Sequence, residues 1–439
     1  MDFVMTLPFI FSGFVNLIYL AAGGIFLPDR VRSLLFIVTG VAYFAATGFF
    51  FFAKRNHLHF SWRIVVVPLV WMLLYALAFR HYGRIGPLTE SLKRYLVFGT
   101  TAYAWGVMIA RMRLEHRLLR SLETISLLLV PAALLYTLNV YLHAGEYFDL
   151  SFGPVTYMTV AYTLLPLFAA IVIRLEKAPA SMENAAKILL ALFFWYVMLL
   201  TTTRGAIFGV LLFAAVVLVH DFARARANTL RMIACALVLA LFAVINLGGM
   251  EGSFEKNPRM SVVIESLEEG TFKTSDRGAL PEDELLELVR DPAPLTNPAL
   301  LEKNLVVNGR INIGDRITLY RLALLETKAH PLRGLGSFGF HAKYGLYPHN
   351  FLLEAYADFG VIGGTILLVG ILFLVVRLFA TAKMCAGTGR ILLFLVAHLF
   401  MVLVSGSLYD MAMLQFGIGY AAFLPRHAKS HAEIPVEIE

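Results

Sequence analysis

Residues 33–53 read SLLFIVTGVAYFAATGFFFFA, a run of 21 residues without a charged side chain. At about 1.5 Å of rise per residue, a helix of this length measures roughly 31 Å, close to the thickness of the hydrocarbon layer of a membrane. Comparable runs recur along the 439 residues, and they explain why 59% of the residues are hydrophobic and only 15% are charged. Soluble domains carry about 25% charged residues. The sequence therefore predicts a protein with many membrane-spanning helices.

The apolar runs predict an all-α polytopic membrane protein with about twelve transmembrane helices. Nine of the helices fall in residues 1–247, a long helical loop follows at 248–356, and three more helices fall in 357–424, before a tail at 425–439. The predicted spans are residues 4–27, 33–53, 64–79, 95–110, 121–143, 155–173, 188–203, 205–219, 232–247, 357–376, 391–404 and 412–424.

The uneven distribution of Lys and Arg predicts the orientation. Alternate short linkers, together with the tail, hold eighteen Lys and Arg, whereas the other short linkers hold seven. Basic residues in short linkers stay in the cytoplasm, so we expect both termini there and residues 248–356 on the outer side. The net charge of +7 then reflects topology and does not indicate nucleic-acid binding. The two cysteines, Cys235 and Cys385, are too few and too differently placed for a disulfide framework or a metal site.

The outer loop is expected to contain two helices and a glycine turn. PEDELLELVRD begins with Pro281 and three acidic residues, which favour a helix start. A second helix is expected to begin after Gly314 and to end before Pro331. GLGSFG at 334–339 matches the dinucleotide-binding pattern GxGxxG, but no strand precedes it, so the sequence favours a turn.

Polar residues at the predicted outer face form the candidate site. The twelve predicted spans are expected to lack Lys, Arg, Asp and Glu, which disfavours an ion-coupled transporter. Arg204 follows three threonines, which favours a polar pocket over the alternative of a lipid-facing anchor. Asn350 is expected to cap the next helix. The candidates are Lys93 and Arg94, for which the sequence slightly favours the alternative of interfacial anchors, and Arg204, Arg316, Tyr320, Arg321, His349, Asn350 and Glu354.

Three segments taken together resemble the bacterial O-antigen ligase and polymerase family. They are TTTRG at 201–205, DRITLYRLALLETKAHPLRGLGSFGF at 315–340, and PHNFLLEAYADFGVIGG at 348–364, in the order typical of that family. Thr203 departs mildly from the family, which usually has a serine-like residue before its arginine. The resemblance implies a glycosyltransferase-C-like fold with its active site on the periplasmic face of the bacterial inner membrane.

The resemblance implies an O-antigen ligase of lipopolysaccharide assembly. Such an enzyme transfers a glycan from undecaprenyl diphosphate to a sugar hydroxyl of the lipid A core, so the expected partners are these two substrates and membrane lipids, without nucleic acid. Carried over by position, the catalytic residues are His349, Arg204 and Arg316. The implied substrate-binding residues are Lys93, Arg94, Tyr320, Arg321, Asn350 and Glu354.

Elementary chemistry is consistent with these roles. A diphosphate is a good leaving group, so the protein needs cations to hold its charge and one base for the acceptor hydroxyl. Two arginines supply the charge without a metal or cofactor, and His349 has an ordinary pKa near ~6.5 that suits proton transfer. Attack opposite the leaving group inverts the sugar carbon, and no carboxylate pair of the glycosidase kind is required.

Alternative functions remain open on the sequence alone. A polysaccharide polymerase would use the same carrier but take a second carrier-linked glycan as its acceptor. A protein O-oligosaccharyltransferase would transfer the glycan to protein. A transporter of lipid-linked glycans would belong to a different class and would need a polar path through the spans.

Overall fold

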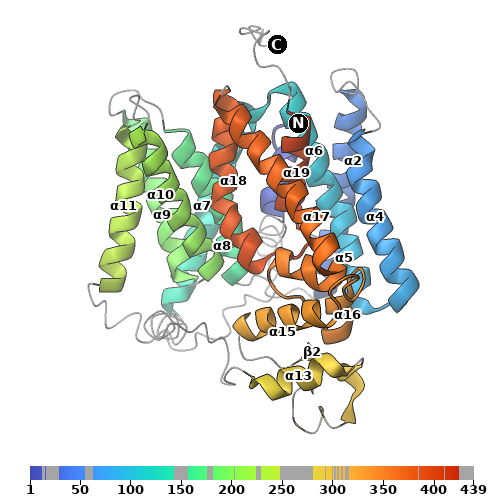
Figure 1. The fold of residues 1–439 in the computed structure, drawn as a ribbon. Helices are drawn as coiled ribbons and strands as arrows, with labels where there is room; N and C mark the ends of the chain where they lie inside the picture. Colours follow the sequence, from blue (N-terminus) through green and yellow to red (C-terminus); the bar gives the residue numbers. More distant parts are fainter. Residues whose placement is uncertain are drawn as a thin grey trace.

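The computed structural model describes residues 1–11, 15, 29–54, 63–142, 157–175, 181–201, 203–223, 229–247, 280–291, 293–298, 300, 303, 306–307, 310–311, 316–383, 385–409 and 411–424. Nearly all of these residues are helical. Most of the helices run side by side in a bundle, and a smaller group of elements covers one end of it (Figure 1).

The bundle begins after the short turn η1 (Val4–Thr6). One long helix passes through α5 (Gly86–Arg94), the π-helical turn η2 (Tyr95–Gly99) and α6 (Thr100–Met112) without leaving helical backbone angles. The other bundle helices are α2 (Asp29–Ala53), α4 (Arg63–Tyr82), α7 (Glu115–Leu142), α8 (Tyr157–Ile173), α9 (Met182–Leu200), α10 (Arg204–Ala223), α11 (Thr229–Leu247), α17 (Phe351–Ala382), α18 (Ala386–Ser405) and α19 (Ala412–Phe423).

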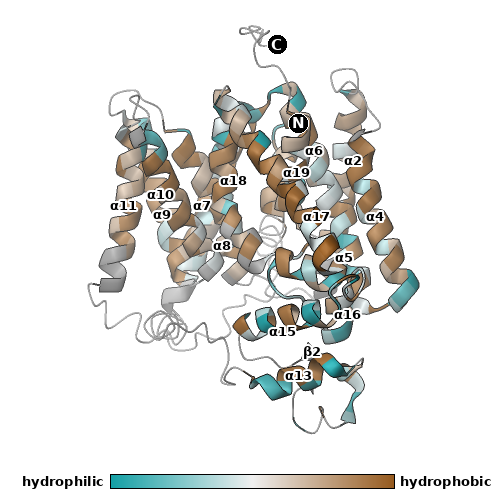
Figure 2. Ribbon diagram, viewed as in Figure 1, coloured by the Kyte–Doolittle hydropathy of each residue, from teal (hydrophilic) through white to brown (hydrophobic). Residues whose placement is uncertain are grey.

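Several helices of the bundle are suited to a lipid environment. Five of the described helices are long and apolar enough to cross a membrane: Leu34–Ala53, Ile64–Tyr82, Glu115–Leu138, Met182–Leu200 and Phe351–Ala382. Their outward faces are apolar (Figure 2), and Leu128 on α7 is 71% exposed. Water would penalise this exposure by about 25 cal/mol per Å², whereas lipid would not. The chain is therefore a membrane protein.

Each predicted span from residues 33–53 onward coincides with a helix of the structure. Most of the predicted span 4–27, and the whole tail 425–439, lie outside the described residues. The count of twelve crossings and the domain borders stay predictions. Two acidic residues, Glu123 and Asp358, lie inside predicted spans near their ends.

The tightest helix pair of the bundle, α6 and α19, depends on glycine. A Cβ atom on Gly106 would lie 2.4 Å from the carbonyl oxygen of Phe416, and one on Gly419 would lie 2.4 Å from that of Tyr103. Small residues allow two helix backbones to approach closely in a membrane, where packing replaces the hydrophobic effect as the main attraction. These glycines therefore fix the position of α19, which follows the loop that reaches the candidate site.

The outer elements form a small core of their own at one end of the bundle (Figure 1). They are α13 (Glu282–Arg290), the short turn η4 (Pro294–Thr296), α15 (Arg316–Ala329) and α16 (Gly339–Tyr344). Both predicted loop helices are confirmed, although Pro281 caps α13 and does not occupy its first turn. The all-α prediction missed a two-residue antiparallel ladder, β1 (Val306–Val307) with β2 (Arg310–Ile311). Apolar side chains join this group to α17, namely Leu285, Leu288, Leu319, Leu322, Phe340 and Ala357.

Candidate functional site

Helix α17 is broken near its outer end, and the break shapes the candidate site. Gly360 has φ 67° and ψ −173°, a conformation open essentially to glycine alone. A Cβ atom here would lie 2.6 Å from the carbonyl oxygen of Pro331. That oxygen accepts a hydrogen bond of 2.7 Å from the backbone N–H of Val361. The break separates a short outer segment, residues 351–359, from the long apolar remainder of α17.

The glycine turn at 334–339 docks onto this outer segment. Gly334 has a positive φ of 63°, and the backbone N–H of Leu335 donates to the carbonyl oxygen of Ala357 at 2.9 Å. The usual helical donor to that oxygen, the N–H of Val361, is directed elsewhere because of the break. The prediction of a turn in place of a dinucleotide-binding loop is confirmed.

Asp358 is a fully buried carboxylate on the outer segment of α17. It accepts hydrogen bonds from the backbone N–H of Phe340 at 2.8 Å and from the hydroxyl of Tyr409 at 2.5 Å. The Tyr409 hydroxyl in turn accepts the backbone N–H of Phe338 at 2.6 Å. Asp358 therefore ties α16 and the loop between α18 and α19 to α17. The sequence analysis identified neither Asp358 nor Tyr409. The only available signal was that Asp358 is an acidic residue inside an apolar span.

Glu354 lies one turn earlier on α17 and is also fully buried. Its carboxylate accepts hydrogen bonds from the hydroxyl of Ser407, at 3.0 Å to the nearer oxygen, and from the backbone N–H of Leu408 at 2.6 Å. These bonds fix the loop that also carries Tyr409. These contacts show that Glu354 positions the loop at Ser407 and Leu408. The family resemblance implies that Glu354 binds substrate, and that role stays a prediction.

His349 occupies a strained position at the start of α17. Asn350 caps the helix as predicted, because its side-chain oxygen accepts the backbone N–H groups of Leu352 at 3.0 Å and Leu353 at 3.1 Å. His349, immediately before the cap, has a positive φ of 56°. A non-glycine residue in this region costs about 1–2 kcal/mol, and such strain clusters at functional sites. The cap therefore fixes the start of the helix immediately after the backbone position from which the imidazole projects.

Arg316 lies close enough to His349 for its positive charge to act on the imidazole, although 32 residues separate the two along the chain. Burial, the positive charge of Arg316 and the charge of His341 lower the pKa of His349 to about 4. The imidazole is therefore neutral at neutral pH. Tyr320, one turn along α15 from Arg316, is half-buried, and burial raises the pKa of its hydroxyl while the Arg316 charge opposes that rise. The charge of Arg316 thus acts on both His349 and Tyr320, whereas the predicted convergence of Arg204, Arg316 and His349 stays a prediction.

A row of rings connects His349 to α16. The ring centroids of His349 and Tyr347 lie 4.3 Å apart, and those of Tyr347 and His341 lie 6.2 Å apart. His341 stacks on Phe338 at 4.7 Å, and Phe338 meets the ring of Tyr409 at 5.3 Å. Sequence analysis did not identify His341 or Tyr347, because aromatic residues in an outer loop carry no spacing signal of their own.

The remaining basic candidates lie at the surface. Lys93 and Arg94, at the end of α5, are exposed, and Arg94 lies 3.4 Å from Glu90 in a surface ion pair. Helix α5 packs against α16, so its residues lie near the outer elements. Arg321 on α15 is exposed. All three side chains are therefore exposed, and their role as substrate-binding residues stays a prediction.

The structure describes Arg204 only by its backbone. Helix α10 begins at Arg204, three residues after α9 ends, so this arginine lies where two bundle helices meet. The flanking residues Thr201 and Thr203 are buried. Thr201 donates its hydroxyl to the carbonyl oxygen of Met198 at 2.6 Å. The structure does not describe the side chain of Arg204.

The geometry provides a guanidinium beside a neutral imidazole on a rigid support. The cation can hold an anionic group, and the imidazole can accept a proton. Among the described residues, no group of three or more His, Cys, Asp or Glu is placed to hold a metal ion. Whether the reaction needs a metal is a separate question, and the metal-independent mechanism stays a prediction.

A comparison with known families matches residues 189–368 to a family model described as O-antigen ligase. The matched segment extends from α9 into α17 and contains Arg204, Arg316 and His349. Lys93 and Arg94 lie outside it. No curated protein matches the chain.

Proposed function

Because residues 189–368 match a family model described as O-antigen ligase, we propose that the chain transfers a glycan from undecaprenyl diphosphate to a sugar hydroxyl of the lipid A core. The observation that carries this proposal is that the positive charge of Arg316 acts on the half-buried imidazole of His349 and lowers its pKa. The reaction takes place on the periplasmic face of the bacterial inner membrane, with both termini in the cytoplasm. It requires neither metal nor cofactor, and it inverts the transferred sugar.

Arg316 holds the diphosphate of the donor. A guanidinium presents a planar set of N–H donors that matches phosphate oxygens, and it stabilises negative charge as the carrier leaves. Arg204 supplies a second cation from the start of α10. Lys93, Arg94 and Arg321 are exposed, and they attract and orient the long anionic donor from the rim.

His349 serves as the base for the acceptor hydroxyl. The hydroxyl oxygen bonds to the anomeric carbon while the bond from that carbon to the diphosphate oxygen breaks, so undecaprenyl diphosphate departs with the electron pair. The hydroxyl proton passes to the neutral ring of His349. A pKa of about 4 makes this imidazole a weak base in the absence of donor. Bound diphosphate offsets the charge of Arg316 and therefore raises the basicity of His349 when the acceptor must lose its proton.

The other residues position this pair. Asn350 fixes the orientation of His349 through the helix cap, and Glu354 fixes the loop that carries Tyr409. Tyr320 lies beside Arg316 and presents a polar group to the sugar. These roles assign positioning to buried groups and substrate contact to half-exposed ones.

Alanine substitution of His349 or Arg316 tests the proposal. Each variant is expected to abolish O-antigen on lipid A in a strain that lacks the native gene, with normal amounts of protein in the membrane. Lys328→Ala is the matched control, because Lys328 is an exposed cation at the far end of the same helix, α15. Unchanged attachment in the His349 variant would remove this residue from the mechanism.

The null phenotype separates the alternative functions. Loss of a ligase leaves long glycans on the lipid carrier, whereas loss of a polysaccharide polymerase leaves single repeat units there. Loss of a protein O-oligosaccharyltransferase removes glycan from protein and leaves lipopolysaccharide unchanged. Loss of a transporter traps the lipid-linked glycan on the cytoplasmic side.

A further inference from the structure

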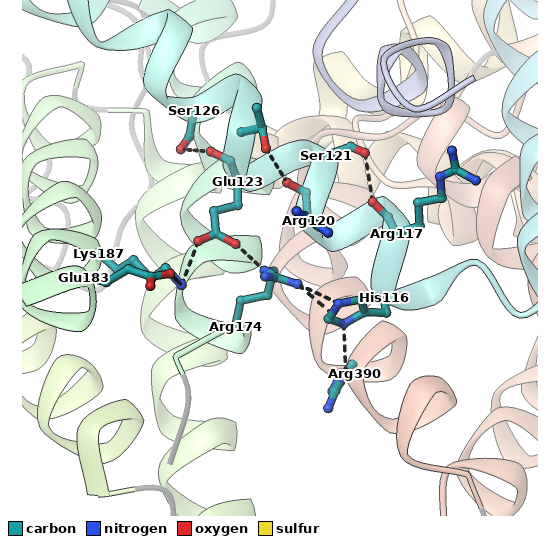
Figure 3. A network of polar contacts seen from close by, with 11 residues as sticks. His116, Arg117, Arg120, Ser121, Glu123, Ser126, Arg174, Glu183, Lys187 and Arg390 are labelled. Carbon is teal, nitrogen blue, oxygen red and sulfur yellow. Dashed lines mark hydrogen bonds and ion pairs between the residues drawn. The ribbon is translucent and has the colours of Figure 1, made fainter. Parts of the chain in front are cut away.

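The opposite end of the bundle carries a group of cations that the proposed reaction does not use (Figure 3). We call it the inner basic cluster: His116 and Arg120 on α7, Arg174 at the end of α8, and Arg390 on α18, joined to Glu123 and Lys187. The short linkers at this end are those that the sequence places in the cytoplasm.

Two guanidinium groups meet on one imidazole. An amino group of Arg174 lies 3.3 Å from the His116 Nε2, and one of Arg390 lies 3.4 Å from the His116 Nδ1. A neutral imidazole has a single lone pair that can accept, whereas each arginine carries five N–H donors. Among the described residues, the acceptors for both guanidinium groups are His116 and one oxygen of Glu123. The cluster is therefore rich in donors and poor in acceptors.

The charges are also unbalanced. Glu123 is shared, because Arg174 contacts one of its oxygens and Lys187 contacts the other at 2.9 Å. Lys187 has a second partner in the exposed Glu183 at 2.7 Å. Arg390 and Arg120 are exposed and take part in none of the described ion pairs, although the charge of Arg390 also acts on the buried carboxyl group of Glu115. An anion with several oxygens, such as a phosphate, would satisfy both the charge and the donors.

The cluster continues directly into apolar surface along α7. His116, Arg120, Glu123 and Leu127 follow one another at spacings of four, three and four residues, so they share one face of the helix. His116 and Arg120 are exposed, and Leu127 is 62% exposed one turn deeper. A soluble phosphate would use only the cations, whereas a phospholipid would also cover the leucine.

We propose that the inner basic cluster binds the phosphate of an anionic phospholipid, whose acyl chains lie along the exposed leucines of α7. Basic groups between helices at the cytoplasmic side of a membrane are suited to anionic headgroups. The ligand would bridge α7, α8 and α18 and so hold together helices that are distant in sequence.

Native mass spectrometry of the full chain in detergent tests the proposal. The probes are phosphatidylglycerol and phosphatidylcholine with identical acyl chains, each titrated against the wild-type protein, Arg390→Gln, Arg390→Lys and Lys383→Gln. Lys383 is the matched control, because it is an exposed cation that follows the end of α17, seven residues before Arg390. Thermal unfolding of each variant reports whether it is folded.

The wild-type protein is expected to bind phosphatidylglycerol in preference to phosphatidylcholine. Arg390→Gln should bind it about tenfold more weakly, the size expected for one lost charge-assisted hydrogen bond. Arg390→Lys should retain part of the affinity, and Lys383→Gln should retain all of it. Equal binding of the two lipids, or an equal loss in Lys383→Gln, would overturn the proposal. Displacement of the lipid by an equal concentration of inorganic phosphate would overturn the lipid as the ligand in favour of a soluble phosphate.

Discussion

Removal of the positive charge of Arg316 should raise the pKa of His349. Three influences hold this pKa at about 4: burial, the charge of Arg316 and the charge of His341. Arg316→Gln removes one of them and leaves the largest, which is burial. The pKa of His349 in this variant should therefore lie above 4 and remain below 6.5, the ordinary value of histidine.

The pKa of His349 can be measured by NMR on protein labelled with ¹³C in the histidine rings. The signal of His349 is assigned by its absence in His349→Gln, and its position is followed between pH 3.5 and pH 8. Lys328→Gln removes a charge of the same sign from the far end of α15 and should leave the titration unchanged. Addition of undecaprenyl diphosphate to the wild-type protein should raise the pKa, because the diphosphate offsets Arg316.

Two results would refute the reasoning. One is a wild-type His349 that titrates near pH 6.5, and the other is an equal effect of Arg316→Gln and Lys328→Gln on the pKa of His349.

The thermal stability of the protein tests independently whether the pKa of His349 is lowered in the folded state. A histidine whose pKa is lower in the folded state binds fewer protons there than in the unfolded state between about pH 4 and pH 6.5. The wild-type protein should therefore lose stability relative to His349→Gln as the pH falls through this window, and not above it.

Three further predictions concern the support of the site, and each is measured as the thermal unfolding midpoint in detergent. Gly360→Ala should lower the free energy of unfolding by about 1–3 kcal/mol, because its backbone angles exclude a side chain, whereas Gly370→Ala in the same helix meets no atom within 4 Å and should not. Gly419→Ala should lower the midpoint by pushing α19 away from α6, and Gly417→Ala, with open space around it, is the control. Glu354→Ala leaves two buried donors without an acceptor and should cost about 1–3 kcal/mol, more than Glu354→Gln. Equal midpoints within any of these pairs would contradict the role given to that residue.

The sequence predicts the helices well because their signal is local. The apolar run at 33–53 and the helix of residues 316–329 each follow from the side chains that they contain, so their positions agree with the structure to within a few residues. The cap at Asn350 is local in the same sense, since its acceptor and donors lie within three residues. The break at Gly360 has no such local signal, because glycine is common in membrane helices.

The candidate site was only partly predictable, because contacts between residues that are far apart in the sequence leave no local signal. Arg316 and His349 were chosen by residue type and by family resemblance, and in the structure the charge of Arg316 acts on the imidazole of His349. Asp358 and Tyr409 were missed because their roles depend on each other across 51 residues. Glu354 was expected to contact substrate, since its own segment gives no indication that Ser407 and Leu408 would cover it.

The sequence by itself determined that this chain lies in a membrane, where its helices run and which family model its segment from 189 to 368 matches. These properties follow from the transfer of apolar side chains into lipid and from motifs that each occupy a short stretch of chain. Only the tertiary structure decided which acids are buried as supports and how far the His349 pKa falls. Burial and charge depend on distances between residues that are far apart in the sequence, and those distances are set by packing.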